Sequence, residues 1–170
     1  MIESTAELIY VDITEEMRQN AITTSNAYKD NLSNSIRSGE GTLAGCLGEE
    51  MFQKVFPNIE RVNDYDFDFT TGYKTIDVKT KERTVPPQLH YDCSVNTMNG
   101  KQRTDYYIFA QVTSDYERGW LLGKIKSSAF FEKAILHPKG SVDPNNNFTF
   151  HCDTYNIPIS ALRPIKLLAS

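Results

Sequence analysis

The sequence predicts an α/β protein with helices on both faces of a mixed central sheet, a three-layer α/β/α arrangement. Three observations support this prediction. Helix signals occur over residues 15–32, which begin with a capping pattern, and over 42–56, which carry an apolar stripe. In residues 63–82 polar and apolar side chains alternate, as they do in a β-hairpin. Tyr106–Val112 is almost entirely apolar, as a central strand should be. The length of 170 residues suits one domain with a substantial core.

We expect a single domain over residues 1–170, with an N-terminal helical arm over 1–40 and the core over 41–170. The short apolar segment Ala6–Val11 predicts an edge strand. Thr14 offers a helix N-cap and is followed by two glutamates, so a helix is expected over 15–32. This helix is polar along most of its length, which makes it our candidate contact in a homodimer.

The composition narrows the classes of function. The formal charge of −4 argues against a broad, sequence-independent grip on DNA, although local basic patches can still face a phosphate backbone. No run approaches the ~18 apolar residues of a membrane span, and the first ten residues lack the basic residues of a secretory signal. Three widely spaced cysteines, Cys46, Cys93 and Cys152, suit reduced thiols in the cytoplasm.

The second predicted helix, over residues 42–56, carries one apolar stripe at four-residue steps, formed by Leu43, Leu47, Met51 and Val55. Gly45 and Gly48 each cost about 1 kcal/mol of helix propensity, which indicates a close approach to another element, such as the hairpin. Two acids follow, Glu49 and Glu50. On a helical wheel Glu50 lies nearer the apolar stripe, so the wheel alone slightly favours Glu50 as the functional acid.

A hairpin organises the middle of the chain. Its first half alternates three acids with three aromatic residues, namely Asp64, Asp66 and Asp68 with Tyr65, Phe67 and Phe69. Gly72 can take a positive φ where the chain reverses. Folding the hairpin about Gly72 places Asp68 opposite Asp77. In the same register Asp66 faces Lys79.

This pairing would gather two or three carboxylates and an ammonium group on one face. Opposed residues have Cβ atoms about 5 Å apart, so like charges repel and need a cation to offset the repulsion. Lys79 offsets part of it, and Mg²⁺, which prefers carboxylate oxygens, would offset more. The opposite face is apolar, so the strands pack on a core and the acids are more than a solvated polar face; its residues are Phe67, Phe69, Ile76 and Val78.

These residues resemble the signature of the PD-(D/E)XK nuclease superfamily, which has the restriction-endonuclease-like fold. The matching features are Gly48-Glu49 on a helix, an upstream Asp, a turn, and Asp77-Val78-Lys79 in a strand. The resemblance covers about residues 41–82 and is nearest to small phage and bacterial nucleases. It implies a core with the order helix, three strands, helix, strand. It also implies metal-dependent hydrolysis of DNA, with an endonuclease as the expected type.

The resemblance assigns metal ligands. Asp77 and an upstream aspartate would hold Mg²⁺, with Mn²⁺ as a substitute, and the backbone oxygen of Val78 would be a further ligand. The hairpin register and the nine-residue spacing favour Asp68 as the upstream acid. The Y-D-F context fits Asp66 equally well, so both remain candidates.

The resemblance also assigns catalytic roles, to Glu49, Asp68, Asp77 and Lys79. Lys79 would position the attacking water and stabilise the charge that develops on the phosphate. The pattern G-E-x-x-F of the family selects Glu49 over Glu50 as the acid that orients water. No organic cofactor is expected.

Basic residues beyond the acids are candidate contacts to DNA phosphates. Lys81 and Arg83 follow directly, and Lys101 and Arg103 form a second small group. DNA is therefore the expected partner, in the cytoplasm, or in the host's cytoplasm if the protein is encoded by a phage. The alternative function is an inactive relative of the nuclease fold that binds nucleic acid or a protein partner.

The remaining elements are predicted from shorter patterns. Strands are expected over 91–95, 119–125 and 148–152, and a helix capped by Ser127 and Ser128 over 129–136. A helix or extended tail is expected over 159–168.

Overall fold

Two β-sheets form the framework of the molecule, for which the computed structural model describes residues 7–29, 40–62, 66–96 and 103–165. The larger sheet has the strand order β1-β7-β6-β4-β3-β2, and the smaller has the order β5-β9-β8. Strands β4 and β6 are parallel, whereas the other described pairings between named strands are antiparallel. The strands are β1 (Ile9–Asp12), β2 (Glu60–Arg61), β3 (Phe69–Thr70), β4 (Thr75–Arg83), β5 (Asp92–Asn96), β6 (Tyr106–Thr113), β7 (Arg118–Lys126), β8 (Ile135–His137) and β9 (Thr154–Pro158).

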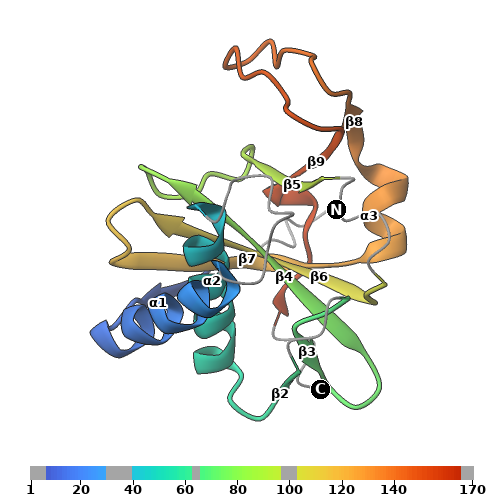
Figure 1. The fold of residues 1–170 in the computed structure, drawn as a ribbon. Helices are drawn as coiled ribbons and strands as arrows, with labels where there is room; N and C mark the ends of the chain where they lie inside the picture. The colour runs from blue at the N-terminus through green and yellow to red at the C-terminus, as the bar shows by residue number, and fades with distance from the viewer. Residues whose placement is uncertain (1–6, 30–39, 63–65, 97–102, 166–170) are drawn as a thin grey trace.

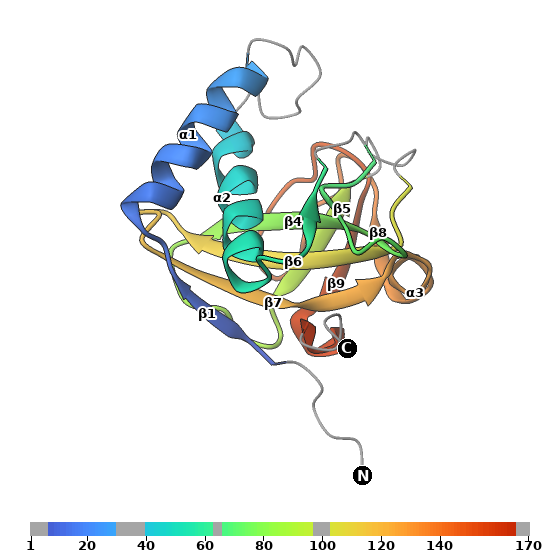
Figure 2. The ribbon, with the colours of Figure 1, turned by 90° about the horizontal axis from the view of Figure 1, so that it is seen from below.

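Helices α1 (Glu15–Lys29) and α2 (Glu40–Val55) lie side by side against one face of the larger sheet (Figure 2). The hydroxyl of Thr14 accepts a hydrogen bond from the backbone N–H of Met17 at 3.2 Å, so the predicted N-cap of α1 is confirmed. The stripe of α2 packs on strands β3, β4 and β6, in a core cluster that includes Leu47, Met51, Phe52, Phe69, Ile76, Val78 and Ile108. This face is the helical layer that the sequence predicts.

The other face of the larger sheet is covered mainly by strands. Residues of β5 and β9 pack there with α3 (Ser127–Lys133), in a second cluster that includes Cys93, Val95, Tyr107, Phe109, Trp120, Leu122, Phe130 and Ile157. The predicted mixed α/β class with a mixed sheet is therefore confirmed. The predicted helical layer on this face is instead a small sheet with one short helix beside it.

The N-terminal segment contributes directly to this framework. Strand β1 pairs with β7 at the edge of the larger sheet, as predicted for an edge strand. Val11, Met17 and Ala21 are buried in the same cluster as the stripe of α2. None of the helices in the described part of the chain is both long and apolar enough to cross a lipid bilayer.

The last third of the chain departs from its sequence-based predictions. Helix α3 ends at Lys133 and is followed by β8, and its serines do not cap it, because the hydroxyl of Ser127 donates to the carbonyl of Thr104 at 2.6 Å. The predicted strand over 148–152 is wrong, since only Thr149 makes an isolated bridge there. The connection between β8 and β9 instead extends away from the rest of the molecule (Figure 1).

Of the two alternatives expected over 159–168, the described residues do not form the α-helix. They form the short 3-10 helix η2 (Ile159–Ala161), followed by an isolated bridge between Arg163 and Lys124. Pro158 precedes η2 and Pro164 follows it closely. Because proline lacks the N–H that an interior helical position needs, this spacing does not allow a longer helix.

Candidate active site

The β3–β4 hairpin has the register that the sequence predicts. Phe69 pairs with Ile76 and Thr70 pairs with Thr75, and Gly72 has a φ of 93° in the turn. The first strand is much shorter than predicted, because the ladder begins only at Phe69. The residues just before it are therefore free to leave the strand direction.

The side chain of Asp68 contacts the backbone of β4 because the chain at Asp68 is not part of the regular ladder. Its backbone N–H donates to the carbonyl of Ile76 at 2.8 Å. Its Oδ2 accepts the backbone N–H of Val78, also at 2.8 Å. Asp68 thus occupies the edge of β4 that a longer β3 would cover, directly beside the D-V-K triplet.

Asp77 and Lys79 stand two residues apart on β4, so their side chains share one face of the strand. The Nζ atom of Lys79 lies 2.9 Å from Oδ2 of Asp77, which is only 4% exposed as a residue. The contact is an ion pair, and Oδ2 of Asp77 is buried from solvent. Tyr107 is the neighbour of Asp77 on β6, and burial together with this negative charge raises the pKa of Tyr107 to about 12.

Glu49 reaches the site from α2. A Cβ atom at Gly48 would lie 1.8 Å from the hydroxyl of Thr80, so only glycine allows α2 to approach β4 this closely. The sequence-based expectation of a close approach is therefore confirmed for Gly48. It is wrong for Gly45, where a Cβ would meet nothing within 4 Å.

Three carboxyl groups meet at this place, from Glu49, Asp68 and Asp77. The charge of each neighbouring acid acts on Asp68, which lies between the other two groups in their mutual interactions. Burial raises the pKa of each group above its usual value, and the charges of Glu49 and Asp77 raise the pKa of Asp68 further. The Lys79 ammonium opposes the shift at Asp77. The site therefore holds more acid than its own cations neutralise.

The structure distinguishes the two glutamates of α2. Glu49 is 8% exposed and contacts Asp68, whereas Glu50 forms an ion pair with Arg61 at 3.0 Å. The helical wheel slightly favoured Glu50, and in the structure Glu50 faces Arg61 on β2 while Glu49 also approaches Asp68. The G-E-x-x-F pattern selects the glutamate that the fold brings to the aspartates.

Arg61 is a residue of this site that the sequence analysis missed. It lies on β2, with one guanidinium nitrogen 3.8 Å from Oε1 of Glu49 and another 3.0 Å from Glu50. The pairing of Arg61 with Phe69 places it next to the hairpin, and its guanidinium lies over the Phe69 ring at 5.9 Å. No local pattern could have found it, because β2 is two residues long and joins the site only through the sheet.

Asp66 takes a different position from the other acids. Its Oδ1 accepts the backbone N–H of Arg103 at 3.1 Å. The ladder between β3 and β4 does not reach Asp66, so the predicted pairing of Asp66 with Lys79 is wrong as a strand register. The geometry thus brings Asp68, rather than Asp66, to Asp77. Lys101 lies outside the described residues.

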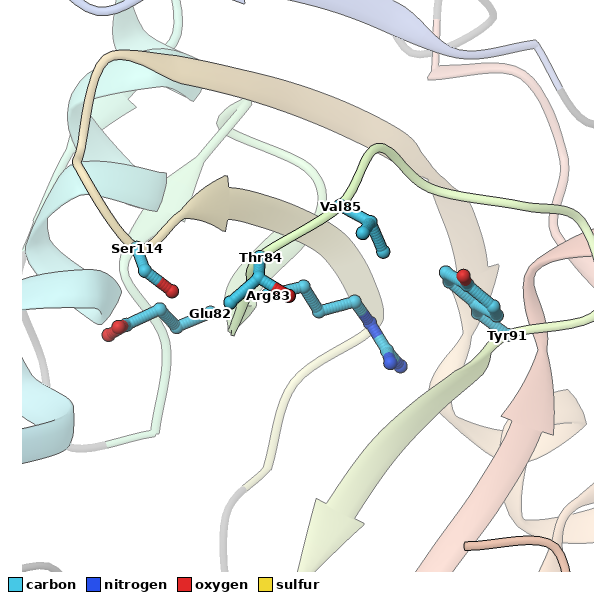
Figure 3. Close-up of a pocket in the computed structure, with 6 residues that line it drawn as sticks. All are labelled: Glu82, Arg83, Thr84, Val85, Tyr91 and Ser114. Carbon is cyan, nitrogen blue, oxygen red and sulfur yellow. The ribbon is translucent and has the colours of Figure 1, made fainter.

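Lys81 and Arg83 continue the row of Asp77 and Lys79 along the same face of β4. Both donate to the backbone carbonyl of Asp92, at 3.1 Å each. They lead to an open pocket at the end of β4 (Figure 3), with a volume of about 420 Å³. This pocket is separate from the three carboxyl groups.

The carboxyl groups fit a hard divalent cation by their chemistry, since such ions prefer oxygen ligands. A carboxylate oxygen has two lone pairs, so Oδ2 of Asp77 can accept a further ligand beside the Lys79 ammonium. Within the described residues, no three acidic, His or Cys side chains are already spaced as a metal cage. A cation bound here would compete with protons for these carboxyl groups, because carboxylate ligands bind a metal in their deprotonated form.

Comparison with known proteins adds no family to this geometry. No protein-family model matches the sequence, and no curated protein matches it significantly.

Proposed function

We propose that the protein is a metal-dependent deoxyribonuclease that hydrolyses phosphodiester bonds in DNA. The observation that supports this most strongly is the meeting of Glu49, Asp68 and Asp77 with the amine of Lys79 in one buried place. These groups come from α2, from the approach to β3 and from β4. A cluster of acids with excess negative charge is costly unless it serves to hold a cation.

In this proposal Asp68 and Asp77 hold Mg²⁺ or Mn²⁺, and the backbone oxygen of Val78 is a further ligand. When bound, the cation supplies Lewis-acid polarisation of the phosphate and a more acidic water. Asp68 also accepts the N–H of Val78, which fixes its orientation at the edge of β4. Arg61 forms ion pairs with both Glu49 and Glu50, so its guanidinium offsets part of the negative charge beside the aspartates.

Lys79 has two tasks in this mechanism. Its ammonium stabilises the charge that develops on the phosphate in the transition state, and it holds the attacking water by hydrogen bonding. Because Nζ lies 2.9 Å from Oδ2 of Asp77, Lys79 would stand beside a phosphate bound at a cation that Asp77 would hold. Glu49 accepts a hydrogen bond from that water and orients it.

We also propose that the chain has a restriction-endonuclease-like core. Helix α2 precedes the hairpin β3–β4, and β6, the next strand of the larger sheet along the chain, is parallel to β4. One feature departs from the family order, because the described chain between β4 and β6 forms strand β5 of the second sheet rather than a helix.

A cleavage assay tests the proposal. Labelled duplex and single-stranded DNA are incubated with Mg²⁺, Mn²⁺ or a chelator, using the unaltered protein and the variants Asp77→Asn and Lys79→Ala. Metal-dependent cleavage that both variants lose is the expected result. The variant Asp12→Asn, which changes an exposed acid on β1, should cleave normally.

Two results would contradict the enzyme. DNA binding without cleavage under every metal condition would favour the inactive relative of the fold. Cleavage that survives both substitutions would place the chemistry elsewhere or in a contaminating nuclease.

A further inference from the structure

The pocket at the end of β4 contains an arginine side chain, Arg83, that is held in place by a backbone carbonyl and an aromatic ring. Arg83 donates to the carbonyl of Asp92 at 3.1 Å, and its guanidinium lies 4.6 Å from the centre of the Tyr91 ring. None of the ion pairs between described residues involves Arg83. The nearest acid on the chain, Glu82, instead accepts a hydrogen bond from the hydroxyl of Tyr116 at 3.0 Å. The guanidinium of Arg83 is therefore ordered, and no described acid forms an ion pair with it.

The partner of Arg83 is also fixed. The backbone N–H of Tyr91 donates to the carbonyl of Gln88 at 2.9 Å, and the carbonyl of Tyr91 accepts the N–H of Ile159 at 2.9 Å. The backbone of Tyr91 is thus held just before β5, and the ring itself is held between the Arg83 guanidinium and an edge-on contact with His90, whose ring centre lies 4.9 Å away. A pre-organised aromatic ring loses little conformational entropy when a planar group stacks on it.

The lining of the pocket suits a flat ligand with polar edges. Figure 3 shows the side chains of Arg83 and Tyr91 pointing toward each other near Val85, with Ser114 at the opposite end. Val85 is 45% exposed and provides an apolar wall, while Thr84 and Ser114 provide hydroxyl groups. The carboxylate of Glu82 also lines the pocket and disfavours a phosphate group inside it. A nucleobase matches this combination of a stacking face, an apolar wall and hydrogen-bonding groups.

The position of the pocket relates it to the candidate active site. Asp77 and Arg83 lie on the same face of β4, six residues apart, which is about 20 Å at the strand rise of ~3.3 Å per residue. Lys81 lies between them and can face the connecting phosphates. A base paired within a duplex is stacked between its neighbours and cannot offer its face to this pocket.

We propose that the Arg83–Tyr91 pocket binds an unpaired base of the DNA substrate, so that the protein acts on DNA with a single-stranded segment beside the bond that is cut. This inference rests on the proposed nuclease function. It specifies the substrate class, namely single strands, overhangs and branched DNA rather than uninterrupted duplex.

The test measures binding separately from cleavage. Fluorescence anisotropy is recorded with labelled oligothymidine and with a blunt duplex, in the Asp77→Asn background so that no DNA is cut. The substitution Tyr91→Ala should weaken binding to oligothymidine by about 5- to 150-fold, the usual effect of removing one stacking platform. Tyr91→Phe, which keeps the ring, should bind like the parent, and the affinity for duplex should be the same in all three proteins.

A second pair of changes keeps the test decisive if Tyr91→Ala folds poorly. Arg83→Gln should weaken oligothymidine binding and Arg83→Lys should restore it only in part, because lysine keeps the charge and loses the planar guanidinium. An abasic position introduced along the oligothymidine should weaken binding to the parent at one register and leave Tyr91→Ala unaffected. Thermal melting checks that each variant is folded.

The outcomes separate this inference from the proposed function. If Tyr91→Ala and Arg83→Gln bind oligothymidine like the parent, or weaken duplex binding equally, the pocket does not hold an unpaired base, even if the protein cleaves DNA. If both weaken single-strand binding selectively but the unaltered protein never cleaves DNA, the pocket stands and the nuclease proposal falls.

Discussion

The two halves of β4 use charge in opposite ways. In the first half Asp77 meets Glu49 and Asp68, and burial raises the pKa of all three carboxyl groups. In the second half Lys81 and Arg83 are held by the neutral carbonyl of Asp92. One strand thus presents an excess of buried acid at one end and ordered positive charge at the other.

This contrast indicates that the two halves of β4 have different roles. The acidic half is packed tightly against α2 through Gly48, which suits a site that must hold its groups in fixed positions. The basic half is open to solvent at its pocket, which suits contact with a long, charged substrate. Changes in the two halves should therefore affect different measurements.

The largest expected effect comes from removing the lysine of the acidic half. Lys79→Ala should lower the rate of metal-dependent cleavage by about 10³-fold, within the range for loss of a group that acts in the transition state. Lys81→Ala, two residues further along the same face, should lower cleavage by no more than about 10-fold, because it removes only a phosphate contact. Single-turnover rates compare the two variants. Equal losses would remove the distinction between the halves.

The next effect concerns the packing of α2 on β4. Gly48→Ala should destabilise the protein by about 2–4 kcal/mol, because the added Cβ overlaps the hydroxyl of Thr80 and lies 3.0 Å from its Cβ. Gly45→Ala is the matched control and should stabilise the same helix by about 0.5–1 kcal/mol, since the new methyl group meets nothing within 4 Å. Urea denaturation measures both. Equal stability of the two variants would show that α2 can move away from β4 at no cost.

Replacing Asp68 is expected to change the stability by a smaller amount, and to raise it rather than lower it. Asp68→Asn removes a carboxyl group whose pKa is raised well above its usual range by burial and by two neighbouring acids. The amide oxygen of asparagine can still accept the N–H of Val78. We expect a gain in stability of about 0.5–2 kcal/mol together with loss of cleavage, as is common when a functional site is relieved of strain. A variant that is both less stable and fully active would contradict the assignment of this acid.

The smallest effect is the dependence of stability on pH and on divalent cations. The folded state has raised pKa values at Glu49, Asp68 and Asp77, so it binds more protons than the unfolded chain above about pH 4. Stability should therefore fall as the pH rises from that value through the raised pKa values. Mg²⁺ should restore it, by about 1.4 kcal/mol at ten times its dissociation constant.

Scanning calorimetry at acidic and at alkaline pH measures this dependence. The rise in Tm with Mg²⁺ should be roughly 3–6 °C at alkaline pH and much smaller at acidic pH, where protons compete with the cation for the acids. In the Asp68→Asn variant, the rise in Tm with Mg²⁺ should differ much less between acidic and alkaline pH. A cation effect that is independent of pH would mean that Mg²⁺ binds somewhere other than these carboxyl groups.

Much of the site's immediate neighbourhood could be predicted because it depends on local patterns. The reversal at Gly72 fixes the register of the hairpin, and the register fixes which residues face each other at its end. The cap at Thr14 and the spacing of apolar residues in α2 likewise act within a few residues. Asp68, Asp77 and Lys79 were identified on this basis together with a family resemblance.

Other features could not be predicted from local patterns. The alternation of Asp66 and Asp68 predicted one continuous strand, but the chain leaves the ladder before Phe69 and carries Asp66 to the backbone of Arg103. Periodicity also failed to predict the second sheet, because β8 and β9 are short strands held together by long-range pairing.

The sequence by itself determined the hairpin turn, the helices on one face and the presence of acids and a lysine along β4, because each of these depends on residues close to one another in the chain. The tertiary structure alone decided that Arg61 joins the acids, and that Arg83 and Tyr91 form a pocket. Those outcomes depend on how α2, β2 and β5 pack on β4. Packing is set by the shapes and burial of many distant residues together, and no short stretch of sequence records it.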